Sequence, residues 1–421
     1  MGRARISLQQ GFAVVAVLAL AVGAWSAPVS EDDDAALRRQ VLELNLITGA
    51  DALEVHVEQL VATPSKTRKL LQVAAKMARG DDQPLNYNAA YVLAKAAQEL
   101  TEADHALTFY RLAADHALKL ESSQKLAVAF GGLIDVCYEH KRYDETVKIC
   151  REFLELKGDG AVGRLKPAVM ERMIQALTRQ GKTDQALQLV TSLVKVYDGN
   201  DGWLFMQLKG WVERESGKYD DAAKTYETVL ERIGKDDRIK RAEQDFYTER
   251  VRYILSSVYI DMKQVHKAAE HLQFLLKMKP DDPTYHNDLG FIWADHDMNL
   301  PESEKLIRRA IELDRKERKI APNAKLEEAN DNAAYLDSLG WVLFKQKKYK
   351  EALPYLEQAV KVEEGQHIEI FDHLGDCLKA LGDTKSALEA YKKGVESAGT
   401  SRREQDRKAA VEKKIKALES Q

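Results

Sequence analysis

The chain has 421 residues, of which 45% are hydrophobic, 31% are charged and only 9 are prolines. This usage, rich in Ala, Leu, Glu and Lys, is typical of helices and predicts an all-α protein. The formal net charge of -4 shows no overall basic excess of the kind that attracts a phosphate backbone, so we expect no nucleic-acid partner.

The amino terminus has the pattern of an export signal. Arg3 and Arg5 precede an apolar run that ends near Trp25, ahead of an acidic stretch. We therefore expect residues 1–26 to be a signal peptide, residues 27–34 an acidic linker, and the mature chain to be exported to the periplasm or beyond the cell. The alternative is an uncleaved anchor in the inner membrane, and only then would the protein contact a membrane.

Residues 35–80 show helical periodicity without a repeat signature, and we expect them to form N-terminal capping helices or one decayed repeat.

Farther along, the three cysteines are too few for a disulfide scaffold and lack the paired spacing of a zinc site. Cys137 and Cys150 would face each other on one helical hairpin, either as a disulfide or as two buried thiols, and the second reading is favoured.

An internal repeat gives the strongest signal. Two segments align without a gap, so that Leu339-Gly340 matches Leu374-Gly375 at an offset of 35 residues, with Ala352 matching Ala387 and Leu356 matching Tyr391. Gly340 and Ala352 are expected where two antiparallel helices approach most closely, because a larger side chain would force the helices apart.

This pattern resembles the tetratricopeptide repeat, a helical hairpin of about 34 residues. The resemblance implies a right-handed α-solenoid of stacked antiparallel helical hairpins. About eight such hairpins are expected in residues 88–397, best defined in 250–397, with lengthened connections at 235–244 and 315–330. Residues 400–420 are expected to form an amphipathic closing helix, a solvated cap rather than a helix whose basic residues touch an acidic surface.

In this family the concave face, lined by the first helix of each hairpin, contacts the ligand. The resemblance thus implies ten partner-binding residues at two positions of successive first helices. They are Gln207, Trp211, Tyr253, Ser257, Asn287, Phe291, Asp337, Trp341, Asp372 and Asp376. The rings of Trp211, Phe291 and Trp341 are either interface anchors or packing between repeats. The acidic end suits a partner segment carrying Lys or Arg.

No motif of an enzyme is present, and we expect neither catalysis nor a cofactor. The strongest candidates for a metal site are Asp295 with His296 and Asp297, and Asp372 with His373 and Asp376. Carboxylates on a helix surface are ordinarily just solvated, and no metal is predicted at either place.

The sequence favours a non-enzymatic scaffold or adaptor of the bacterial cell envelope that binds proteins or unstructured peptide segments. The envelope assignment is an analogy with other tetratricopeptide proteins, because fold does not fix function. Two alternatives stay open, a subunit of a polysaccharide-export or outer-membrane assembly scaffold, and a metal-dependent hydrolase.

Overall fold

The computed structural model describes residues 34–80, 85–158, 160–197, 202–320, 330–399 and 402–420. Within these residues every regular element is helical, so the all-α prediction is confirmed. The predicted signal peptide lies outside the described residues, as do residues 27–33 of the linker and residues 321–329 of the second long connection. No helix in the described part is both long and apolar enough to cross a membrane.

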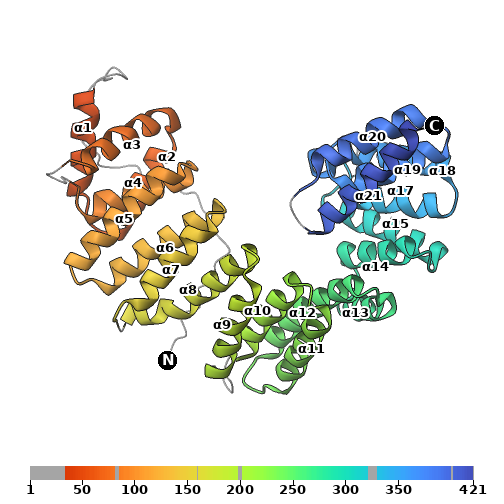
Figure 1. Ribbon diagram of the computed structural model, residues 1–421, viewed down its shortest axis with the longest axis horizontal. Coiled ribbons are helices and arrows are strands. Elements are labelled where there is room, and N and C mark those ends of the chain that lie inside the picture. The colour runs from red at the N-terminus through yellow and green to blue at the C-terminus, as the bar shows by residue number, and fades with distance from the viewer. Residues whose placement is uncertain are drawn as a thin grey trace. The chain divides into compact units, whose positions relative to one another are not determined.

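The chain divides into two compact units, with the boundary between Val169 and Met170, inside helix α8. Within each unit, most helices that follow one another in the chain pack side by side (Figure 1). The first unit begins with α1 (Asp34–Glu43), the short 3-10 helix η1 (Leu44–Leu46), α2 (Ala50–Val61) and α3 (Pro64–Ala78). Two helix pairs follow, α4 (Tyr87–Glu99) with α5 (Ala103–Lys119), and α6 (Ser123–Glu139) with α7 (Tyr143–Glu155).

Helix α8 (Gly160–Arg179) and helix α9 (Thr183–Val196) form the next consecutive pair. The second unit continues with α10 (Gly202–Glu215) and α11 (Tyr219–Lys235), α12 (Arg241–Asp261) and α13 (Val265–Met278), α14 (Pro283–Asp295) and α15 (Leu300–Glu317), α17 (Ala333–Lys345) and α18 (Tyr349–Ala359), and α19 (Ile368–Ala380) and α20 (Thr384–Ser397). A short 3-10 helix, η2 (Glu363–Gly365), precedes α19, and α21 (Arg402–Glu419) ends the described chain.

The same turn joins the two helices of each of these eight pairs. Its central residue takes a left-handed conformation, and the next N–H donates back to a carbonyl five residues earlier, as Lys348 does to Leu343 at 2.9 Å. This is the Schellman geometry, which satisfies carbonyls left open at a helix end. The left-handed residues are Thr101, Lys141, Gly181, Gly217, Lys263, Asp297, Lys347 and Gly382.

Small residues set the distance between the helices of a pair. A Cβ atom added to Gly340 would lie 2.5 Å from Cγ of Leu356, and one added to Gly375 would lie 2.3 Å from Cε1 of Tyr391. Ala352 is completely buried beside the first of these contacts. The predicted close approach at Gly340 and Ala352 is therefore confirmed, and the repeated small residue fixes how each hairpin closes.

The three cysteines are buried, and the structure contains them as thiols. Burial, with the nearby Glu145 carboxylate, raises the pKa of the Cys137 thiol to about 12. Burial likewise raises the pKa of the Cys377 thiol to about 11. Both groups are therefore protonated at neutral pH, and they behave as small apolar side chains of the core.

Candidate functional site

In the second unit, the first helices of successive pairs touch one another, as α14 touches α17 and α17 touches α19. Polar side chains bridge these neighbours. The hydroxyl of Tyr253 on α12 donates to Asp288 on α14 at 2.8 Å, and the hydroxyl of Tyr335 on α17 lies 3.3 Å from that of Thr284 on α14. We call the surface made by α12, α14, α17 and α19 the first-helix face, because it carries most of the predicted partner-binding residues.

Trp341 is the centre of this network on α17. Its ring stacks on His373 of α19, with 4.0 Å between the ring centroids, and on Phe344 of its own helix at 4.9 Å. Its Nε1–H donates to a carboxylate oxygen of Asp295 at 3.1 Å. Trp341 is consequently buried and holds two neighbouring repeats together, which is the packing role that the sequence left open.

His373 is buried between Trp341 and Asp337. Its Nδ1 lies 2.9 Å from one oxygen and 3.0 Å from the other oxygen of the Asp337 carboxylate. A carboxylate only accepts, so Nδ1 carries the proton. Burial alone would lower the pKa of His373, but the charge and hydrogen bond of Asp337, helped by Glu369, outweigh burial and raise it.

The carboxyl end of the first-helix face is strongly charged, and α21 covers it. Lys414 donates to Asp372 at 2.6 Å and to Asp376 at 2.8 Å, and Arg407 donates to Glu369 at 2.6 Å. Burial would raise the pKa of Glu369, but the two guanidinium groups of Arg407 and Arg403 lower it overall. The closing helix therefore does touch an acidic surface, the reading that the sequence disfavoured.

The ten predicted partner-binding residues fall into two groups. Asn287, Asp337, Trp341 and Asp372 are buried, while Gln207, Trp211, Ser257, Phe291 and Asp376 are half-buried and Tyr253 is exposed. The three acids already bond to side chains of the same chain. Partner binding by these ten residues stays a prediction. Tyr253 on α12 is the most exposed of them, and both predicted residues of α10 are half-buried.

The accessible part includes a residue that sequence reasoning missed. Phe246 lies two turns before Tyr253 on α12, so the two rings share one stripe of that helix, and their exposed fractions are 57% and 37%. Phe246 also packs edge-on against Tyr247, which packs against Trp203. Its spacing of seven from Tyr253 was the available signal, since large apolar residues at that spacing mark one helix face.

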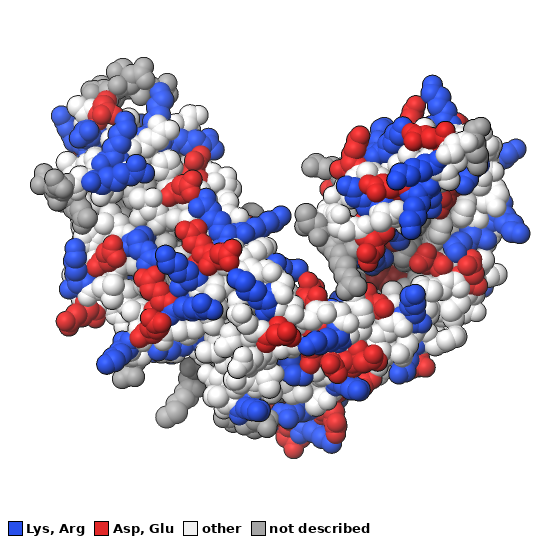
Figure 2. Space-filling model, viewed as in Figure 1, with Lys and Arg blue, Asp and Glu red and all other residues white. Residues whose placement is uncertain are grey.

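Charges of both signs are mixed on the face that Figure 2 shows. Basic and acidic side chains alternate across both units on the face that Figure 2 shows, and no large area of one sign is seen there. In the described residues no group of three or more His, Cys, Asp and Glu side chains is placed to hold a metal ion. Asp295 instead accepts from Trp341, and Asp297 pairs with Lys345 at 2.9 Å.

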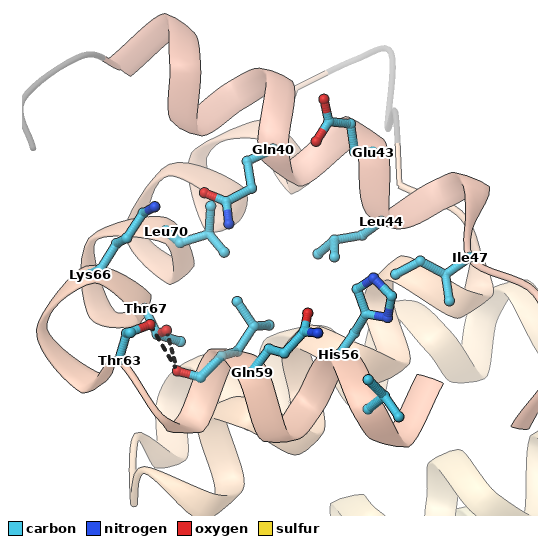
Figure 3. A pocket seen from close by; sticks show the side chains of 12 residues that line it. Gln40, Glu43, Leu44, Ile47, His56, Gln59, Thr63, Lys66, Thr67 and Leu70 are labelled. Carbon is cyan, nitrogen blue, oxygen red and sulfur yellow. Dashed lines mark hydrogen bonds between the residues drawn. The ribbon is translucent and has the colours of Figure 1, made fainter. Parts of the chain in front are cut away.

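A pocket in the first unit was not foreseen from the sequence. It has a volume of about 770 Å³ and lies among α1, η1, α2 and α3. Buried Leu44, Leu60 and Leu70 line it, together with polar side chains such as Glu43 and Lys66. Figure 3 shows Leu44 and Leu70 on opposite sides of the space. Helical periodicity indicated the helices but not that they leave a space between them.

Comparison with known proteins identifies the repeats. Residues 172–237, 332–363 and 368–400 each match the tetratricopeptide repeat family. A TPR repeat-containing protein of Pseudomonas aeruginosa is 25% identical over 206 residues, which is 49% of this chain and 30% of that protein. The matched region is thus less than a third of the relative's own length.

Two solved structures illustrate the comparison with known folds, and the first is described as a tetratricopeptide repeat protein. One from Parabacteroides merdae is 15% identical with a TM-score of 0.47, and the match covers 68% of this chain and 98% of that one. MamA of Desulfovibrio magneticus is 19% identical with a TM-score of 0.34, covering 45% and 96%.

The matched segments coincide with the structural repeat described above. Residues 332–363 contain the pair α17 and α18 with the Gly340 contact, and residues 368–400 contain α19 and α20 with the Gly375 contact. Both segments also contain the left-handed turn, at Lys347 and Gly382. These three segments of the chain are tetratricopeptide repeats.

Proposed function

We propose that this protein is a non-enzymatic adaptor of the cell envelope, which binds segments of partner proteins on its first-helix face. Tetratricopeptide repeats support a protein–protein interaction scaffold, and three segments of the chain match that family. The observation that carries the proposal is the stripe of Phe246 and Tyr253 on α12. These rings remain exposed on a first helix, whereas Trp341 is packed between repeats.

Exposed aromatic rings beside polar groups are the usual anchors of protein interfaces. The hydroxyl of Tyr253 is fixed by Asp288, and its ring lies 5.7 Å from that of Tyr285, so the anchor is already held in place. A side chain that needs no ordering on binding loses less entropy, which favours affinity. The expected partner is a peptide segment with apolar side chains that pack on these rings.

The envelope part of the proposal rests on the amino terminus. Arg3, Arg5 and the apolar run that follows have the order of a signal peptide. Determining the amino-terminal residue of the protein recovered from its native cells tests this point. A new terminus near residue 27 supports export, and an intact Met1 in a soluble fraction contradicts it.

The binding site is tested by capture with a cross-linker in the native envelope. The chain with Phe246→Ala and Tyr253→Ala is compared with wild type and with a matched control, Leu118→Ala with Leu120→Ala. The control residues have similar exposed fractions, 47% and 58%, but lie at the end of a second helix. We expect a captured protein to be lost only with the first variant.

Circular dichroism must show that both variants keep the wild-type helix content. If all three chains capture the same proteins, or if the control loses them equally, the stripe on α12 is not the binding site. If no protein is captured by the wild-type chain, the adaptor function itself is contradicted.

A further inference from the structure

The contacts between α19 and α21 have a regular register. Glu369, Asp372 and Asp376 share one stripe of α19 at spacings of three and four residues. On α21 the matching cations are Arg403, Arg407 and Lys414, which share one stripe at spacings of four and seven. Arg403 bonds to Glu369, Arg407 to Glu369 and Asp372, and Lys414 to Asp372 and Asp376.

Partner numbers rise together along both helices, so α21 runs parallel to α19. Helix α21 also packs against α20, the second helix of that pair. A helix in this place, parallel to one first helix and touching the second helix of the same pair, stands where the first helix of a further repeat would begin. Helix α21 is therefore a single helix bound at the end of the array, with no second helix following it in the described chain.

The apolar part of this contact is small. Among the described side chains of α21, Val411 and Leu418 are the buried apolar ones, and Ile415 packs half-buried against the same core. A cavity of about 290 Å³ lies between the starts of α19 and α21, lined by His367, Glu369, Arg403 and Arg407 among others. The polar part of the contact with α19 consists of ion pairs, and those that reach solvent weaken as salt rises.

We propose that α21 covers, within the chain, a binding surface for a basic amphipathic helix of a partner protein, and that such a helix replaces α21. This inference rests on the proposed function, since it assigns a second partner surface to the same first-helix face. The chemistry of the partner helix follows from charge complementarity with the acidic side chains of α19. This helix carries cations at spacings of four and seven residues toward the acids of α19, with an apolar side chain in the place of Val411.

The test uses the full chain and two variants that break the same ion pairs from opposite sides. Arg407→Glu with Lys414→Glu releases α21 and leaves the acids of α19 in place. Asp372→Asn with Asp376→Asn also releases α21 but removes two of the acids. The probe is a fluorescein-labelled peptide of residues 402–420, and its binding is followed by fluorescence anisotropy.

We expect hydrogen exchange in α21 to become faster in both variants. The peptide should bind the Arg407→Glu, Lys414→Glu chain at least about tenfold more tightly than wild type, and this binding should weaken as salt rises. It should bind the Asp372→Asn, Asp376→Asn chain no better than wild type. Equal binding to both variants, no gain with either, or α21 amides that stay protected would each overturn the proposal.

This outcome is separate from that of the α12 experiment. Adding Phe246→Ala and Tyr253→Ala to the released chain should leave peptide binding unchanged, because those residues lie on α12. If the α12 variant loses its envelope partners but the released chain still binds the peptide, the α19 surface is supported independently of the proposed function. If the envelope partners are kept and the peptide does not bind, only the α12 site is supported.

Discussion

The indole of Trp341 lies flat on the imidazole of His373, with 4.0 Å between the ring centroids and 13° between the planes. Asp337, one turn before Trp341 on the same helix, accepts a hydrogen bond from Nδ1 of that imidazole at 2.9 Å. One helix thus supplies both an aromatic face and a carboxylate to a buried histidine of the next repeat. Both contacts favour a protonated imidazole, the first through cation–π attraction and the second through charge.

The stability of the last two repeats should therefore depend on pH through His373. Its pKa in the folded chain is raised above the ordinary value of 6.5, for which Asp337 is the main cause once the opposing effect of burial is overcome. The stabilisation is fully present below pH 6.5 and is lost as the pH rises through the raised pKa. Besides Asp337, the facing charges are Glu369 on α19 and Arg407 on α21.

Urea unfolding measured between pH 5.5 and pH 9 checks this dependence. Wild type should lose stability across the upper part of that range, and His373→Gln should show a flatter profile. If the two profiles have the same slope, another group is responsible and the raised pKa of His373 is wrong.

Two adjacent glycines of α6 should respond in opposite ways to substitution by alanine. A Cβ atom at Gly132 would lie 2.3 Å from the ring of Tyr110, which is buried, whereas one at Gly131 would meet nothing within 4 Å. Overpacking at Gly132 should cost about 1 to 3 kcal/mol. At Gly131 the lower entropy of the unfolded chain should instead stabilise by about 0.5 to 1 kcal/mol.

Urea unfolding followed by far-UV circular dichroism compares the two variants directly. Because both substitutions add one methyl group to the same helix, helix propensity cancels between them. Equal effects would mean that Tyr110 moves aside at little cost, and that the small residue does not set the spacing of these helices.

The sequence predicted the repeat well because its rule is local. Gly340 and Gly375 recur at a fixed spacing, and each contacts a residue 16 positions later in its own hairpin. Contacts between repeats were harder to predict. Nothing in the local pattern shows that Trp341 stacks on His373, or that Lys414 reaches Asp372 from 42 residues away. Such pairs depend on how neighbouring hairpins stack, which the spacing within one hairpin does not determine.

The left-handed turns offer a test of backbone strain at equivalent positions of two repeats. Lys347 has φ of 65° and Gly382 has φ of 89°, and both follow a first helix. A left-handed conformation costs an L-residue roughly 1 to 2 kcal/mol, which glycine avoids. Lys347→Gly should thus stabilise the chain, with part of the gain offset by the greater entropy of glycine when unfolded.

The converse substitution, Gly382→Ala, should destabilise by about 1 kcal/mol, because a Cβ there meets no other atom and only the backbone conformation is at issue. Thermal unfolding of both variants measures the two effects. A lower melting temperature for Lys347→Gly would contradict this expectation. It would show that the exposed Lys347 side chain stabilises the fold by more than its left-handed backbone conformation destabilises it.

A buried ion pair joins Arg315 on α15 to Asp331, which lies just before α17, and it should matter far more than an exposed pair elsewhere on the surface. Arg315 donates through two nitrogens to both oxygens of Asp331, at 2.7 and 2.5 Å, and Asp331 has a side-chain exposure of 1%. Arg309 and Asp281 also pair at 3.2 Å, but their side chains are 47% and 75% exposed.

Asp331→Ala removes the bidentate carboxylate partner of Arg315, whose side chain is only 17% exposed, so the substitution should cost about 3 to 5 kcal/mol. Asp281→Ala should cost less than about 1 kcal/mol, since water and salt already screen that pair. Urea unfolding at low and high salt distinguishes the two, because only the exposed pair should respond to salt. A loss below about 1 kcal/mol for Asp331→Ala would mean that packing alone holds α15 against α17, and that the ion pair adds little to it.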